Sequence, residues 1–189
     1  MRTKSVILKS AIVVFSAFVF LLAGCKKDDN KVEGTTNFSV SMKSSTESRS
    51  NYEAVNIDIQ EVSIHTSADS SESSGWFNLD TNTGIYDLMD FAAGNDTIIA
   101  LDSIMQVQTV SQIRLVLGEN NTVVENGETY DLDTPSAQTS GLKIQIHAEL
   151  QPNVNYKVVL DFDADQSIIK TGNNKYKLQP VINATLVEY

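Results

Sequence analysis

The 189-residue chain carries 24 Asp and Glu against 14 Lys and Arg, so its formal net charge is −10 at pH 7. An acidic surface of this kind repels the phosphate backbone, which excludes nucleic acid as an expected partner. Because Cys25 is the only cysteine, an intrachain disulfide is excluded as well, and the fold must depend on its apolar core.

Residues 1–24 predict an export signal. Arg2, Lys4 and Lys9 form a basic start, an apolar run extends over residues 11–22, and two small residues follow it. A signal peptidase recognises this order of charge, apolar segment and small residues. The run is shorter than the roughly 20 apolar residues with which a helix spans the hydrocarbon layer. We therefore expect a signal peptide that is removed, and a retained N-terminal anchor is the alternative.

Cys25 lies directly after this segment, within the tetrapeptide Leu22-Ala23-Gly24-Cys25. The tetrapeptide resembles the bacterial lipobox, whose cysteine receives a thioether-linked diacylglycerol and becomes the N-terminus of the mature protein. Two or three acyl chains on one residue, palmitate among them, hold a membrane more firmly than a single chain does. We therefore expect Cys25 to be lipidated and the membrane to be a partner through this lipid.

Residues 25–37 are polar and contain little that a core could bury, so we expect a flexible tether between the anchor and the folded domain. Within it, Lys26-Lys27-Asp28-Asp29 resembles the acidic signal that follows the lipidated cysteine in Bacteroidetes-type surface lipoproteins. This resemblance implies an outer membrane lipoprotein that faces the cell exterior. The periplasmic face of the membrane is the alternative.

Alternating apolar residues begin the folded part. Phe38, Val40 and Met42 predict a first strand, and the next strand extends over residues 55–64. In that second strand the apolar residues change phase near Gln60-Glu61, which predicts a β-bulge there. Two polar, serine-rich segments, residues 43–51 and 66–75, are expected to be loops.

The middle of the chain contains a central strand and a hairpin. Residues 113–117 alternate in the manner of a strand, and Asn126-Gly127 after Val123 and Val124 is typical of a two-residue hairpin turn. No long segment keeps a helical period, and at most one turn is expected over residues 87–92.

Three later runs alternate apolar and polar residues in the same way, over residues 142–150, 154–162 and 176–186. Each run gives a strand one apolar and one polar face, which suits antiparallel sheets packed face to face. Pro180 lacks an amide hydrogen, so we expect an edge strand or a bulge at that position. The sequence predicts an all-β, antiparallel β-sandwich of seven to nine strands in a single domain over residues 38–189.

Several segments resemble one family in the same order along the chain. They are residues 55–59 (VNIDI), 86–90 (YDLMD), 112–117 (QIRLVL), 134–136 with 140–143 (TPS and SGLK), and 159–164 (VLDFDA). These segments resemble the family called domain of unknown function 4382, over roughly residues 38–187. The resemblance implies a lipidated bacterial protein with an immunoglobulin-like or prealbumin-like (carbohydrate-binding-like) sandwich. It implies no activity and no site residues.

Asp161, Asp163 and Asp165 follow the apolar face of a predicted strand at every second position. Three carboxylates spaced by ~6.6 Å along a strand repel one another unless a cation or a basic partner lies between them. Calcium is the candidate cofactor, because hard cations bind carboxylate oxygens. The glycine and the distal glutamate of an EF-hand loop are missing, and pairing with Arg114 or Lys170 is the structural alternative.

Trp76 is the candidate for stacking a ligand, since an aromatic face suits a sugar ring, although a tryptophan beside Phe77 and Leu79 also suits a core. His65 and His147 are expected to face outward, too isolated for acid–base or nucleophilic catalysis. We therefore expect no enzymatic activity.

The function that these observations favour is a lipid-anchored binding or interaction module, monomeric, whose partner is a glycan or another surface protein. The alternative is a fimbrial or pilus-type subunit that assembles by strand donation. In that alternative, cleavage at Arg49 by a trypsin-like protease releases residues 37–42 and opens a groove. An accessory factor of a periplasmic enzyme is a third class.

Overall fold

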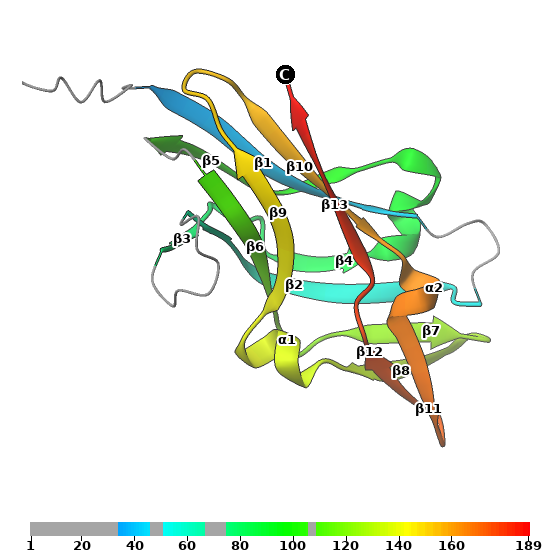
Figure 1. The fold of residues 1–189 in the computed structure, drawn as a ribbon. Coiled ribbons are helices and arrows are strands. Elements are labelled where there is room, and N and C mark those ends of the chain that lie inside the picture. The colour runs from blue at the N-terminus through cyan, green and yellow to red at the C-terminus, as the bar shows by residue number, and fades with distance from the viewer. Residues whose placement is uncertain (1–33, 46–50, 67–74, 106–108) are drawn as a thin grey trace, which may run out of the picture. The chain divides into compact units, whose positions relative to one another are not determined.

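The computed structural model describes residues 34–45, 51–66, 75–105 and 109–189 (Figure 1). Its strands are β1 Thr35–Ser44, β2 Ala54–His65, β3 Trp76–Asn78, β4 Gly84–Asp87, β5 Thr97–Met105, β6 Thr109–Leu117, β7 Thr122–Glu125, β8 Glu128–Asp133, β9 Leu142–Glu149, β10 Tyr156–Phe162, β11 Ile168–Gly172, β12 Lys175–Leu178 and β13 Ile182–Glu188. The helices are short: a 3₁₀ helix η1 (Leu88–Gly94), α1 (Pro135–Thr139) and α2 (Ala164–Ser167). No described helix is long and apolar enough to cross a membrane.

The strands form two sheets that pack into a sandwich-like arrangement, so the predicted all-β fold is confirmed (Figure 1). The smaller sheet has the order β13-β10-β1-β5, and the larger sheet has the order β11-β12-β8-β7-β2-β6-β9. In the larger sheet, β2 pairs with β3, β4, β6 and β7 along its length. Residues 32–189 form one compact unit.

The sheets are mixed, which differs from the purely antiparallel sheets that were expected. β1 is parallel to β10 in the smaller sheet, and β12 is parallel to β8 in the larger one. The other pairs are antiparallel, including the predicted hairpin of β7 and β8. Its turn residues Asn126 and Gly127 have φ values of 54° and 79°, the left-handed conformations that such a turn requires.

The core lies between the two sheets and is made by the alternating residues that the sequence indicates. Phe38, Val40 and Met42 of β1 are fully buried, as are the inward residues of β2 and β10. The predicted bulge in β2 is present, because the pairing with β6 shifts between Ile59 and Glu61. The strand β1 begins at Thr35, so the last three residues of the predicted tether belong to the folded domain. The expected loops lie largely outside the described residues.

Pro180 separates two strands that the sequence indicates as one. The run ends at Leu178 in β12, and the chain continues from Ile182 as β13 in the other sheet. Ser167 holds this crossing: its hydroxyl accepts a hydrogen bond from the Val181 amide (2.8 Å), and its carbonyl accepts one from the Gln179 amide (2.8 Å). The crossing carries the chain from the larger sheet to the smaller one.

Candidate functional site

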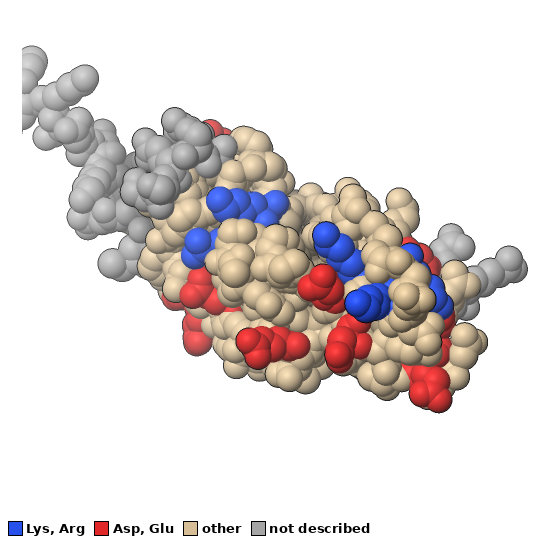
Figure 2. Space-filling view, turned by 90° about the horizontal axis from the view of Figure 1, so that it is seen from below, with Lys and Arg blue, Asp and Glu red and all other residues tan. Residues whose placement is uncertain are grey.

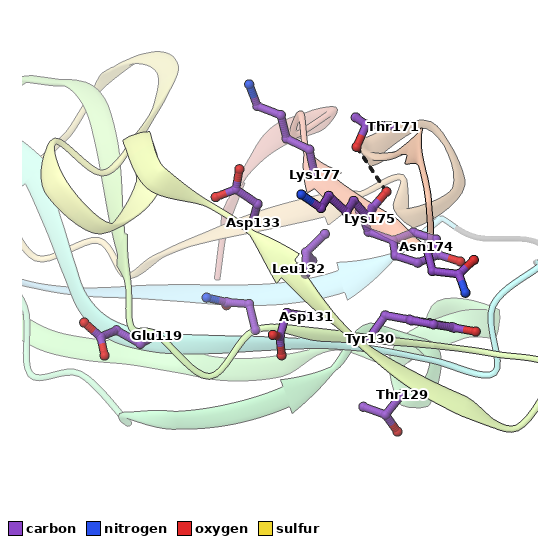
Figure 3. A pocket seen from close by; sticks show the side chains of 12 residues that line it. Glu119, Thr129, Tyr130, Asp131, Leu132, Asp133, Thr171, Asn174, Lys175 and Lys177 are labelled. Atoms are coloured by element: carbon purple, nitrogen blue, oxygen red, sulfur yellow. Dashed lines mark hydrogen bonds between the residues drawn. The ribbon is translucent and has the colours of Figure 1, made fainter.

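A cleft of about 690 Å³ lies at the corner of the larger sheet, where β8, β11 and β12 meet the loop between β6 and β7 (Figure 3). The parallel pairing of β8 and β12 sets Leu132 opposite Tyr176 and Asp133 opposite Lys177. Leu132 and Tyr176 are buried, so the charged residues beside them in sequence face solvent. The alternation of each strand therefore supplies both the buried and the charged parts of the cleft.

The charged side chains that line the cleft come from two strands and one loop. Asp131 and Asp133 on β8 are exposed, as is Glu119 in the loop, whereas Lys175 and Lys177 lie on β12 (Figure 3). The cleft thus combines carboxylate acceptors with ammonium donors. A ligand with hydroxyl groups could bond to both.

Tyr176 forms a rigid aromatic part of the lining. Its hydroxyl donates a hydrogen bond to Glu125 Oε2 (2.8 Å), and the Lys170 ammonium donates to the same oxygen (2.6 Å). The rings of Tyr130 and Tyr52 lie with their centroids 5.1 Å and 6.4 Å from that of Tyr176, and the Lys170 ammonium lies 5.2 Å from it. These contacts fix the tyrosine before any ligand arrives.

The same group shows coupled shifts of pKa. Hydrogen bonds from Lys170 and then Tyr176 hold the pKa of the Glu125 carboxyl below its usual value. The hydrogen bond to Glu125 raises the pKa of Lys170 well above the usual value of a lysine. Burial is the main cause that raises the pKa of Tyr176. At neutral pH the group is therefore an ion pair with a neutral tyrosine.

Hydrogen bonds to buried polar groups hold the loop that carries Glu119 in place. Asp58, which is 2% exposed, accepts hydrogen bonds from the Asn120 amide (3.2 Å) and Asn120 Nδ2 (3.0 Å). Asn121 Oδ1 accepts from the Asp58 amide (2.9 Å), and Asn121 Nδ2 donates to the Gly118 carbonyl (2.7 Å). Gly118 is required here, because a β-carbon would collide with the Asp58 carboxylate.

The sequence reasoning did not identify this cleft. The available signal was the alternation of Asp131 and Asp133 with Leu132, and of Lys175 and Lys177 with Tyr176. What it could not show is that β8 and β12, which are far apart in sequence, pair in parallel.

Trp76 is half-buried on the short strand β3, so it is neither a core residue nor a free platform. The Arg114 guanidinium carbon lies 4.5 Å from its ring centroid, and the Lys143 ammonium lies 5.8 Å from it. The His65 ring meets it edge-on at 5.0 Å. Cationic side chains therefore already contact the indole that was expected to stack on a sugar.

The expectation that His65 faces outward into solvent is wrong. His65 is fully buried, and its Nδ1 lies 2.9 Å from the Ser111 hydroxyl oxygen. It does point away from the core side of β2, but Trp76 from β3 packs over it. Ser111 is buried as well, so substrate cannot reach this histidine–serine pair. His147 is exposed, as expected.

The three aspartates proposed for calcium do not converge. Asp161 pairs with Lys43 (2.8 Å), whereas Asp163 accepts a hydrogen bond from the Gln166 amide (2.9 Å) and caps α2. Asp165 is exposed within α2. The strand ends at Phe162, so the alternation on which the prediction depended stops before Asp163. In the described part of the chain, no group of three His, Cys, Asp or Glu side chains could hold a metal ion.

Cys25 and Arg49 lie outside the described residues, so the predictions made for them stay predictions.

The comparisons with known proteins give one match. The family model described as "Domain of unknown function (DUF4382)" matches residues 34–180, which include the cleft and the strands from β1 to β12. No curated protein and no solved structure matches the chain. The chain belongs to the DUF4382 family.

Proposed function

We propose that this protein is a non-catalytic binding module, monomeric, anchored in the outer membrane by lipid on Cys25 and facing the cell exterior. The observation that carries the proposal is the cleft, which exposed carboxylates of β8 and exposed lysines of β12 line together. The lipobox-like sequence before Cys25 supports the location.

A glycan is the ligand class that suits the cleft best. Sugar hydroxyls both donate and accept hydrogen bonds, so they can bond to Asp131, Asp133, Lys175 and Lys177. Tyr130 adds an apolar surface with a polar end. Pockets with a few convergent polar groups around an apolar part are the usual form of small-ligand sites.

A glycan array probed with the native protein tests the cleft. We expect binding that the double replacement Asp133→Asn with Lys175→Gln reduces by about tenfold or more, as expected for lost hydrogen bonds to charged groups. The matched control is Asp96→Asn with Lys157→Gln, which removes an ion pair on the smaller sheet. Equal binding by the two double variants would contradict the assignment of the cleft.

Mass spectrometry of the native molecule tests the anchor. We expect residues 1–24 to be missing and the mass of Cys25 to be raised by acyl chains. A chain that retains Met1 and a free thiol would contradict both the anchor and the location.

One observation favours strand donation as a second candidate function. β1 lies between β10 and β5 in the smaller sheet, and Phe38, Val40 and Met42 fill the core from it. Loss of β1 would therefore open an apolar groove that a strand from another copy could fill. Detergent-resistant oligomers after cleavage at Arg49 would support this function, and a persistent monomer would contradict it.

A further inference from the structure

Two cations lie side by side on the outer face of the larger sheet. The antiparallel pairing of β6 and β9 sets Arg114 directly opposite Lys143. Their neighbours in sequence, Ile113, Leu115, Leu142 and Ile144, are buried, so both cations project away from the core. Like charges directly opposite each other in a sheet destabilise it. An anion between them would remove that cost.

Arg114 is held in place by several contacts. Its Nε donates to the Ser63 hydroxyl oxygen (3.0 Å), and its Nη2 donates to Glu61 Oε1 (3.2 Å). Its aliphatic part lies so close to Gly141 that a β-carbon there would be 2.6 Å from Arg114 Cγ. The Trp76 ring covers the guanidinium at 4.5 Å. The guanidinium is therefore positioned before any ligand binds.

Lys143 carries the positive charge that Glu61 does not balance. It is exposed, and no carboxylate among the described residues lies within ion-pair distance of it. Glu61 balances Arg114 alone, so the pair of cations keeps one net positive charge. This local charge stands out in a chain whose net charge is −10. Figure 2 shows several Lys and Arg side chains across one face, with acidic side chains beside and between them.

We propose that Lys143 and Arg114, with Trp76 beside them, form a binding site for the anionic group of an acidic polysaccharide, a carboxylate or a sulfate. Lys143 donates a charge-assisted hydrogen bond to the anion. The positive charge of Arg114, held in a fixed position, attracts the anion as well. The half-exposed indole provides an apolar edge for the sugar ring that carries the charge. The site is separate from the cleft, so neither proposal depends on the other.

Trp76 makes the site directly observable, because it is the only tryptophan in the chain. Indole emission of the full-length protein in detergent is followed while it is titrated with an oligogalacturonate, a sulfated chondroitin oligosaccharide or a neutral malto-oligosaccharide. We expect saturable emission changes with one or both acidic sugars and none with the neutral sugar. The two acidic arms distinguish carboxylate from sulfate. About 1 M salt, where the Debye length is ~3 Å, is expected to weaken binding strongly.

The variants locate the response. Lys143→Gln is expected to weaken binding by about tenfold or more, and Lys143→Arg to restore most of it, since a charge-assisted hydrogen bond is lost and regained. Lys43→Gln removes a lysine of the smaller sheet that pairs with Asp161 and is expected to change affinity less than about twofold.

Three outcomes would overturn the proposal. The first is the absence of any response to both acidic sugars at low salt. The second is equal weakening by Lys143→Gln and Lys43→Gln. The third is a response to a poly-glutamate peptide alone.

Discussion

The buried carboxylate of Asp58 accepts hydrogen bonds from two donors of Asn120 and from Gln60 Nε2 (2.5 Å). These bonds fix the loop between β6 and β7. On either side of Asn120 in this loop, Glu119 lines the cleft and Asn121 accepts a hydrogen bond from the Asp58 amide of β2. A solvent-exposed carboxylate could not do this, because water would compete for the same donors.

Replacement of Asp58 by Ala is therefore expected to lower the free energy of unfolding by about 3 kcal/mol, since the donors of Asn120 and Gln60 lose a charged acceptor. Urea denaturation followed by circular dichroism measures the change. Asp80→Ala is the matched control, because Asp80 is exposed, and it should leave the midpoint nearly unchanged. Similar midpoints for the two variants would show that Asp58 does not hold the loop.

The lowered pKa of the Glu125 carboxyl predicts how the free energy of unfolding depends on pH. Its pKa is below the usual value of 4.5 in the folded protein, because Lys170 and Tyr176 donate hydrogen bonds to it. A carboxyl whose folded pKa is depressed stabilises the fold above its unfolded pKa and loses that contribution as the pH falls through the folded value. We expect Glu125→Gln to flatten the loss of stability below about pH 4.5.

The measurement is the urea midpoint of the wild type and of Glu125→Gln from neutral to acidic pH. Glu128→Gln, on an exposed residue of the same hairpin, is the control and should follow the wild type. If Glu125→Gln and the wild type lose stability in parallel, the ion pair with Lys170 is not the cause.

At the scale of the element, local alternation was predictable and long-range pairing was not. The phase change in β2 and the Asn126-Gly127 turn have local causes, so the sequence shows both. The split at Pro180 was hidden, because Tyr176–Leu178 and Ile182–Leu186 keep the same parity on both sides of it. The missing amide hydrogen of Pro180 was a signal, but it was interpreted as an edge or a bulge.

The surroundings of the candidate sites depend on long-range pairing in the same way. The environment of Trp76 depends on Arg114, which reaches it from β6, and the cleft depends on the parallel pair β8 and β12. Neither pairing leaves a local signal in the sequence. The alternation of Asp161, Asp163 and Asp165 in sequence does not carry over to one strand face, because β10 ends at Phe162 and α2 begins after Asp163.

Ser167 provides the test of the crossing between sheets. It is fully buried, and its hydroxyl is the acceptor for the Val181 amide. Ser167→Ala leaves this amide unpaired and is expected to cost about 1–2 kcal/mol of unfolding free energy. Ser140→Ala, which removes an exposed hydroxyl at the end of α1, is the control in the same urea titration. A Ser167→Ala midpoint equal to that of the control would refute this role.

At the scale of the whole molecule, the proposed anchor and the folded domain are separate parts of the chain. Replacement of Cys25 by Ala would remove the proposed acceptor of the lipid, and we expect it to leave the sheets of the described residues unchanged. We expect the variant to leave the membrane fraction and to keep the circular dichroism of a β protein. Fractionation of cells measures this, and protease treatment of intact cells tests which side the domain faces. A variant that stays in the membrane fraction would contradict the lipid anchor.

The parallel pairing of β1 with β10 also affects how the chain folds. Ser39 of β1 bonds to the carbonyl of Tyr156, 117 residues further along the chain. Contacts of such sequence separation slow folding, because a large loop must close before any stabilising interaction is gained. For a chain that we propose to be exported, slow collapse is useful: the polypeptide stays translocation-competent until it has been threaded through the secretion channel.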